Sequence, residues 1–179
     1  CSSDLVGKIY QSLGGFYDIA SHGHMYRTRA RGNFRAKRIK PIVGDVVDFK
    51  SGYVLSVHRR INRLSRPPLA NLTQAIIVTS TQEPRFSAGL LDRQLVALGV
   101  QHIKPLIYFS KLDLLDPEQQ AHYLKIAKYY HDIGYDVFAP KKAFCPTTLD
   151  LLKNHLTGQE TVVMGQTGVG KSSLLNHLK

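Results

Sequence analysis

The sequence predicts a small all-β barrel followed by an α/β domain whose mostly parallel sheet is covered by helices on both faces. Two observations support this fold class. Residues 1–66 contain short runs of alternating polar and apolar residues separated by Gly, Asn or Pro, as expected for strands joined by turns. Beyond residue 71, compact apolar runs alternate with amphipathic stretches, which is the pattern of βαβ units.

The first domain, residues 1–66, is expected to form five strands, at 7–11, 16–20, 24–31, 43–49 and 53–58. In the third strand arginines recur at every second position, so a strand places them on one face. More basic residues follow, with aromatic residues interleaved. A five-stranded barrel with a basic, partly aromatic face is typical of the oligonucleotide-binding (OB) fold. We therefore predict RNA contacts from Arg27, Arg29, Arg31, Arg35, Lys37 and Arg38.

The charge of the chain is concentrated in this first domain. Residues 1–66 carry 13 Lys and Arg against 4 Asp and Glu, whereas residues 67–179 carry 11 against 9. A basic domain beside a nearly neutral one indicates a polyanionic partner, because neutralised phosphates release their counterions. Two alternatives stay open at this point: the charge serves solubility alone, or the arginines form a solvated outer strand face.

A linker is predicted at residues 67–71, because Pro67 and Pro68 forbid a helix and remove two backbone donors. The α/β domain then covers residues 72–179. Its buried strands are expected at four apolar runs, 72–79, 103–109, 135–139 and 161–164.

Three helices are expected between these strands. Ser87 caps the first, in which leucines recur at helical spacing until Gly99 ends it. The second begins with Asp116 as cap and Pro117 at the first helical position, and extends to about Asp132. The third covers about 147–156.

A phosphate-binding loop is predicted at residues 165–172, where GQTGVGKS satisfies G-x-x-x-x-G-K-[ST] between a predicted strand and a predicted helix. Its glycines let backbone N–H groups surround a phosphate, and the helix N-terminus adds its dipole. We assign Lys171 and Ser172 as catalytic residues, with Ser172 as the Mg²⁺ ligand. The predicted nucleotide contacts are Gly165, Gln166, Thr167, Gly168, Val169, Gly170, Lys171, Ser172 and Ser173.

A base-recognition segment is predicted at SKLD, which follows a buried strand and comprises Ser110, Lys111, Leu112 and Asp113. The carboxylate of Asp113 can accept hydrogen bonds from the ring N–H and the exocyclic amine of guanine, a donor pair that adenine lacks. The long stem of Lys111 can lie over the base and extend towards the phosphate loop.

The chain resembles the circularly permuted ribosome-small-subunit-dependent GTPases, the RsgA family, also called YjeQ or YloQ. The resemblance extends over nearly the whole chain. It rests on five stretches in the family's order: GKIYQSLGGFYDI (7–19), IVGDVV (42–47), NRLSRPPLANLTQAIIV (62–78), SKLD (110–113) and GQTGVGKSSLLN (165–176). Permutation accounts for the base motif preceding the phosphate loop.

The resemblance implies an OB-fold barrel and a P-loop GTPase domain. It also implies binding and hydrolysis of GTP to GDP and phosphate with Mg²⁺, and a role in late assembly of the small (30S) ribosomal subunit through its rRNA. We further expect a cytoplasmic monomer that does not contact a membrane.

Among the departures from the family pattern, two concern the nucleotide site directly. The family usually has Asn or Thr where Ser110 stands, and a hydroxyl replaces only part of an amide's hydrogen bonding. The family also continues past the phosphate loop with a Mg²⁺-closing threonine, a D-x-P-G motif and a zinc-binding domain. We therefore expect Zn²⁺ only in that downstream domain, and weak hydrolysis from these residues alone.

Two further functions are compatible with the residues. In an ATP-using P-loop enzyme, SKLD would be an incidental turn. In an OB-fold RNA-binding module, the nucleotide site would be vestigial. Guanine against adenine competition separates the first from a GTPase, and an RNA affinity that ignores nucleotide would indicate the second.

Overall fold

The computed structural model describes residues 4–30, 34, 39–50 and 52–179. It divides into two compact units, residues 1–72 and 73–179, which are described separately.

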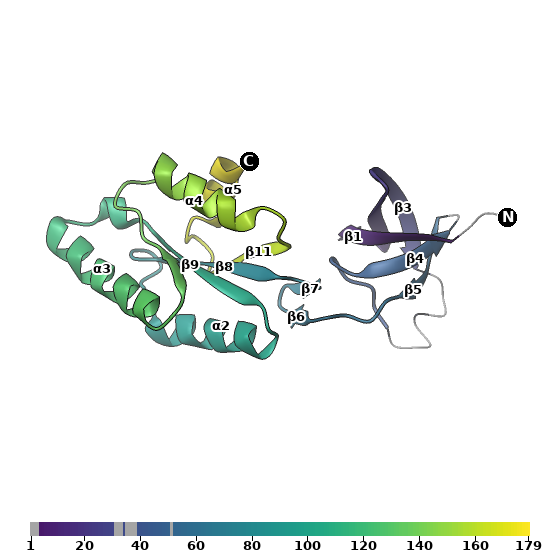
Figure 1. Ribbon diagram of the computed structural model, residues 1–179, viewed down its shortest axis with the longest axis horizontal. Coiled ribbons are helices and arrows are strands. Elements are labelled where there is room, and N and C mark those ends of the chain that lie inside the picture. Colours follow the sequence, from purple (N-terminus) through teal and green to yellow (C-terminus); the bar gives the residue numbers. More distant parts are fainter. Residues whose placement is uncertain (1–3, 31–33, 35–38, 51) are drawn as a thin grey trace. The chain divides into compact units, whose positions relative to one another are not determined.

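The first unit contains the predicted barrel. Five strands close on themselves in the order β1-β2-β3-β5-β4, because β1 pairs with both β2 and β4 (Figure 1). The inward side chains of these strands form its core, which includes Ile9, Ile19, Val47 and Phe49. The strands are β1 (Leu5–Leu13), β2 (Phe16–Ser21), β3 (His24–Ala30), β4 (Val46–Lys50) and β5 (Tyr53–Val57).

The fourth strand begins three residues later than predicted because a turn precedes it. Asp45 is fully buried and its carboxylate accepts a hydrogen bond from the backbone N–H of Ile42, 2.8 Å away. The same carboxylate receives two hydrogen bonds from the guanidinium of Arg60, at 2.7 and 2.8 Å. This ion pair fixes the turn against the segment that leaves the barrel.

The predicted linker, residues 67–71, is not a free connection. Pro68–Ala70 forms strand β7, which pairs antiparallel with β6 (Arg63–Ser65). Proline is tolerated there because it is the first residue of a strand in a two-stranded sheet. The backbone N–H of Ala70 also donates to the carbonyl of Val43 at 3.0 Å, so this hairpin packs on the turn before β4. This strand was not expected, because the two prolines favour an irregular connection and the contact with Val43 joins residues distant in sequence.

The second unit is the predicted α/β domain. Its sheet has the order β10-β9-β8-β11 and every pairing is parallel. Helices α2 and α3 lie on one face, and α4 and α5 lie on the other (Figure 1). The elements are β8 (Gln74–Ser80), α2 (Ala88–Val100), β9 (Lys104–Ser110), the 3₁₀-helix η1 (Leu112–Leu114), α3 (Pro117–Asp132), β10 (Asp136–Phe138), α4 (Pro146–Leu156), β11 (Thr161–Met164) and α5 (Lys171–Leu178).

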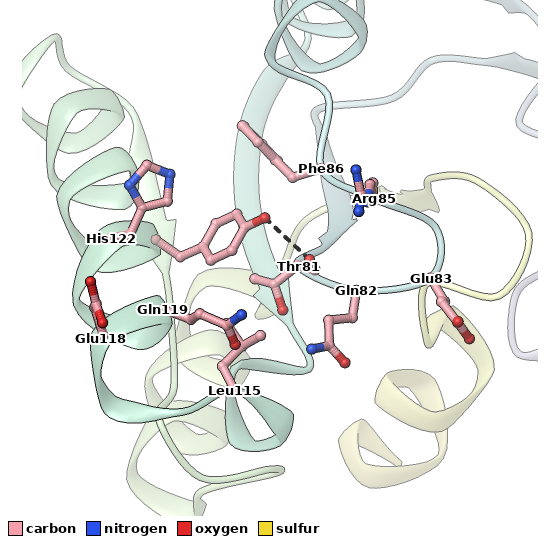
Figure 2. Close-up of a pocket in the computed structure, with 10 residues that line it drawn as sticks. Thr81, Gln82, Glu83, Arg85, Phe86, Leu115, Glu118, Gln119 and His122 are labelled. Atoms are coloured by element: carbon pink, nitrogen blue, oxygen red, sulfur yellow. Dashed lines mark hydrogen bonds between the residues drawn. The ribbon is translucent and has the colours of Figure 1, made fainter.

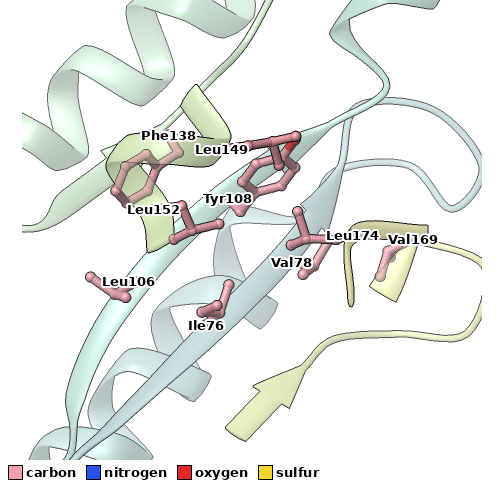
Figure 3. Packing of buried hydrophobic residues seen from close by; sticks show 9 residues of the cluster. All are labelled: Ile76, Val78, Leu106, Tyr108, Phe138, Leu149, Leu152, Val169 and Leu174. Atoms are coloured by element: carbon pink, nitrogen blue, oxygen red, sulfur yellow. The ribbon is translucent and has the colours of Figure 1, made fainter. Parts of the chain in front are cut away.

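Both faces of this sheet are apolar, as its parallel strands require. One face packs Ile76, Val78, Leu106 and Tyr108 against α4 and α5, together with Leu174 from α5 (Figure 3). The predicted helix caps are present on the other side, where the N–H of Leu90 donates to Ser87 Oγ and the N–H of Gln119 donates to Asp116 Oδ1. Helices therefore pack on both faces of the sheet, and this packing fixes the positions from which the loops at the carboxyl ends of the strands begin.

Two further findings concern the described residues alone. None of their helices has the length and apolar character required to cross a bilayer. They contain no group of three or more His, Cys, Asp and Glu side chains that could hold a metal ion.

Candidate functional site

The carboxyl ends of three neighbouring strands converge on the predicted nucleotide site. Strand β9 ends at Ser110, and β11 ends directly before Gly165, with β8 between them in the sheet. Parallel strands place their carboxyl ends at one edge. The two motifs therefore meet in space although the base-recognition segment comes first in the sequence.

The phosphate loop turns from β11 into α5 at residues 165–170. Gly165 has a φ of 149°, and a Cβ there would lie 2.4 Å from the carbonyl oxygen of Val78. Any larger residue would therefore displace the loop from the end of β8. Gly168 and Gly170 have φ values of 82° and 98°, and Gly170 directly precedes α5.

Lys171 and Ser172 occupy the first turn of α5. The ammonium of Lys171 lies within the curve of the loop, donating to the carbonyl oxygens of Gly165 at 2.9 Å and Gln166 at 2.5 Å. Ser172 is exposed, and among the described residues its hydroxyl has no protein partner. The hydroxyl is thus available to a metal ion, and Mg²⁺ prefers such oxygen ligands.

Other predicted loop residues divide by burial. Val169 is 1% exposed and packs in the core, while its carbonyl faces Ser110. Gln166, Thr167 and Ser173 are exposed at the surface of the site.

Ser110 joins the two motifs directly. Its hydroxyl donates to the carbonyl oxygen of Val169 at 2.6 Å, and the carbonyl of Thr79 lies at 3.4 Å. The residue that departs from the family pattern therefore contacts the phosphate loop backbone. Its side chain acts on the position of the loop.

Lys111 and Asp113 line a cleft of about 160 Å³ beside the phosphate loop. Asp113 is exposed there, as a carboxylate that receives guanine donors must be. Lys111 has a left-handed φ of 64°, and its ammonium donates to the carbonyl of Glu83 at 2.6 Å, in the loop after β8. This carbonyl lies 4.0 Å from where a Cβ of Gly168 would stand, so the ammonium is beside the phosphate loop, the direction in which we expected the side chain to extend. Leu112 is buried, so its side chain packs in the core.

Tyr108, in the wall of the cleft, has a raised pKa. Burial, and secondarily the negative charge of Asp113, raise the pKa of Tyr108 to about 12. The hydroxyl of Tyr108 therefore stays protonated well into the alkaline range, and it can donate a hydrogen bond at the cleft wall.

Sequence reasoning missed Phe144, which forms part of one wall of this cleft. The turn between β10 and α4 contributes Pro140, Ala143 and Phe144, and the ring of Phe144 stacks on His177 of α5 at 3.8 Å and an interplanar angle of 2°. The resemblance to the family places a further guanine-contacting stretch near residues 138–142, but Phe144 lies outside it and carries no periodic signal. Phe144 adds a flat apolar surface to this wall of the cleft.

The barrel carries part of the predicted basic face. Arg27 and Arg29 lie on one outward face of β3, with their guanidinium carbons 4.8 and 4.2 Å from the ring centre of Phe16 on β2. Asp18 Oδ1 lies 3.9 Å from Nε of Arg27. The other four predicted contacts, Arg31, Arg35, Lys37 and Arg38, lie outside the described residues.

Comparison with known proteins identifies relatives of both units. The family model described as RsgA GTPase matches residues 57–179, and the RsgA N-terminal domain model matches residues 6–53. The chain is 54% identical over 179 residues to the small ribosomal subunit biogenesis GTPase RsgA 1 of Lactiplantibacillus plantarum, covering 97% of this chain and 60% of that protein. It is 52% identical to the small ribosomal subunit biogenesis GTPase RsgA of Pediococcus pentosaceus, covering 97% of this chain and 58% of that protein.

Solved structures show the same fold. The crystal structure of YloQ, titled a circularly permuted GTPase, is 38% identical with a TM-score of 0.79, covering 98% of this chain and 64% of that chain. YjeQ from Thermotoga maritima is 26% identical with a TM-score of 0.86, covering 99% and 66%. The chain thus spans about 60% of the length of the curated relatives it matches.

Proposed function

The chain belongs to the RsgA GTPase family, and from that premise we propose that it is a GTP-binding and GTP-hydrolysing factor in small-subunit ribosome assembly. The observation that carries the nucleotide part is the contact of Ser110 with Val169, which joins the base-recognition segment to the phosphate loop. The names of the relatives support the assembly role.

In this proposal, Asp113 selects guanine by accepting from its ring N–H and exocyclic amine. Lys111 and Phe144 line the same cleft and offer an aliphatic stem and an aromatic ring to the base. An adenine base places an acceptor where guanine has its ring donor, so the carboxylate would be left unpaired.

Hydrolysis proceeds by attack of water on the γ-phosphate. The ammonium of Lys171 and the N–H groups of the loop stabilise the charge on the phosphate oxygens, and the dipole of α5 adds to this. When bound, Mg²⁺ neutralises charge on the β- and γ-phosphates, and the exposed hydroxyl of Ser172 would be its protein ligand. These are the two residues that we propose as catalytic.

The barrel would supply the RNA contacts. Arg27 and Arg29 present two guanidiniums on one face, and each can bind a phosphate or stack on a base. A cytoplasmic, monomeric protein acting on the rRNA of the small subunit remains our prediction.

The test is calorimetric titration of the chain with GDP and with ADP, repeated with Asp113→Asn. We expect GDP binding, no ADP binding, and loss of guanine preference in the variant. Equal binding of GDP and ADP would overturn the GTPase proposal in favour of an ATP-using enzyme. If neither nucleotide binds in the presence of Mg²⁺, the nucleotide site is vestigial and RNA binding is the remaining function.

A further inference from the structure

A second cleft lies on the α/β unit, between the loop that follows β8 and the first turns of α3 (Figure 2). It has a volume of about 740 Å³ and shares no lining residue with the guanine cleft. Ligand pockets commonly fall in this range of volume. Neither predicted motif contributes a side chain to it.

Two aromatic rings form a rigid part of its lining. Phe86 meets Tyr123 edge to face, with ring centres 5.9 Å apart, and also packs against the buried Phe109 at 5.7 Å. The hydroxyl of Tyr123 donates to the carbonyl of Thr81 at 3.2 Å. These contacts hold both rings in place, so the cleft offers a preformed apolar surface.

Two amide side chains approach the cleft from opposite walls. Figure 2 shows Gln119 of α3 and Gln82 of the β8–α2 loop on either side of it. Their backbone N–H groups are hydrogen-bonded, but within the described part of the chain their side-chain amides have no partner. Each amide has a donor and an acceptor, which suits the polar edge of a planar heterocycle.

The charged residues of the lining are arranged around these groups. Glu118 lies on the outer side of α3 and Glu83 on the far side of the loop, both directed away from the two amides (Figure 2). Arg85 lies next to Phe86 and has no carboxylate partner among the described residues. The cleft therefore combines aromatic surface and amides with a cation at its rim.

We propose that this cleft binds an unpaired nucleobase of the RNA partner, an inference that rests on the RNA-binding function proposed above. The base packs against Phe86 and Tyr123, and its polar edge pairs with the amides of Gln82 and Gln119. The adjoining phosphate lies near Arg85. Unpaired bases in RNA are bound in this way, by stacking and by hydrogen bonds to their edges.

The cleft is connected to the guanine site through backbone contacts. Thr81 donates to the carbonyl of Ser110 from both its N–H, at 3.3 Å, and its hydroxyl, at 3.2 Å. Lys111 in turn holds the carbonyl of Glu83. A base that moves this loop changes the surroundings of Lys111, so RNA and guanine nucleotide affect each other's affinity by the same factor.

The experiment uses the whole chain saturated with GDP and a single-stranded RNA of about ten nucleotides containing one 4-thiouridine, a length within the usual site size. After irradiation, tryptic peptides are mapped by mass spectrometry. We expect crosslinks in the peptides covering residues 86–93 and 112–125, which contain Phe86, Gln119 and Tyr123. In a Gln82→Ala/Gln119→Ala variant, the crosslink yield falls at least about fivefold, because two hydrogen bonds to the base are lost.

The matched control is Gln159→Ala, which removes an exposed amide outside the cleft and leaves the yield unchanged. Calorimetry with GDP confirms that both variants fold and retain the guanine site. Crosslinks confined to barrel peptides would overturn the cleft assignment while leaving RNA binding in place. The absence of any crosslink would overturn RNA binding and the cleft together. Displacement of the crosslink by free 5′-mononucleotides at equal base concentration would make this a mononucleotide site and overturn the RNA assignment.

Discussion

Ser110 donates from its hydroxyl to the carbonyl oxygen of Val169, 2.6 Å away, and this hydrogen bond joins two segments that lie 59 residues apart in sequence. One segment recognises the base and the other surrounds the phosphates in the function proposed here. A bound nucleotide must contact both at once. Their relative position is therefore part of its affinity, because a preorganised site loses less free energy in ordering on binding.

Removing this hydroxyl with Ser110→Ala is expected to weaken GDP binding about tenfold, which corresponds to the net free energy of one hydrogen bond of about 1 to 1.5 kcal/mol. Isothermal calorimetry with GDP measures the change. Ser110→Thr keeps a hydroxyl at the same position and should retain most of the affinity. If the alanine and threonine variants bind GDP equally well, the contact does not position the loop.

Gly165→Ala should abolish measurable nucleotide binding. A Cβ at this position would lie 2.4 Å from the carbonyl oxygen of Val78, and the φ of 149° is strained for alanine. The loop would have to leave the end of β8. Gly89→Ala in α2 is the control, because a Cβ there meets nothing within 4 Å and alanine favours a helix by about 1 kcal/mol. Nucleotide binding in Gly165→Ala at the original affinity would contradict the close approach.

The parts of the fold that were predictable are those with a local signal. Strand β8 is a run of buried apolar residues, and α3 begins with Asp116 and Pro117 as a helix start requires. The unpredicted parts depend on contacts between distant segments. Strand β7 pairs with the distant turn at Val43, and the two prolines of the sequence indicated a linker although Pro68 begins this strand.

The same distinction applies to the candidate site. The phosphate loop has fixed residue types because backbone geometry and phosphate charge demand them. Phe144 belongs to no such motif. Its position at the cleft depends on the packing of α5, which brings His177 onto its ring. The contact of Lys111 with Glu83 could not be predicted from the sequence either, because it depends on the path of the loop after β8.

Breaking the ion pair of Arg60 and Asp45 should destabilise the barrel. Asp45 is fully buried, and its hydrogen bonds raise the pKa of Arg60, with the opposing effect of burial smaller. Asp45→Asn leaves the guanidinium without its counter-charge, at a cost of about 3 kcal/mol of unfolding free energy. Hydrogen exchange of β1 and β4 during urea unfolding reports the barrel alone.

Lys50→Ala supplies the comparison for this ion pair within the same unit. Lys50 Nζ lies 3.7 Å from Asp4 Oδ1, but the two side chains are 39% and 60% exposed. Losing an exposed pair of this kind changes stability by less than about 0.5 kcal/mol. Equal losses of unfolding free energy in the two variants would mean that the burial of Asp45 does not make its ion pair more important for stability.

Asp48 should make barrel stability depend on pH in the acid range. Hydrogen bonds from Ser56, and then from His58, lower the pKa of its carboxyl below the ordinary value. The folded state therefore favours the ionised form. The resulting stabilisation is complete above the unfolded pKa of about 3.9 and is lost as the pH falls through the lower folded value.

Asp48→Asn is the variant that isolates this effect. At neutral pH we expect it to be less stable than the original chain by about 1 kcal/mol, the value of a charge-assisted hydrogen bond at a partly exposed site. The difference should shrink as the pH is lowered below about 4, where the carboxylate itself becomes protonated. Urea unfolding at several pH values measures it. A difference that stays constant down to pH 2 would show that ionisation of Asp48 plays no part.

Arg29→Ala should weaken RNA binding and reduce its dependence on salt. Arg29 lies over Phe16, and in the described part of the chain no carboxylate pairs with it, so its charge is available to a phosphate. Each lost phosphate contact lowers the slope of log affinity against log salt by about 0.7 to 0.9. Fluorescence anisotropy with a single-stranded RNA at several salt concentrations gives that slope. Arg93→Ala removes an equal charge from an exposed position on α2, outside the barrel. We expect this variant to have the same slope as the original chain. Equal losses from both variants would mean that RNA responds only to the total charge of the chain.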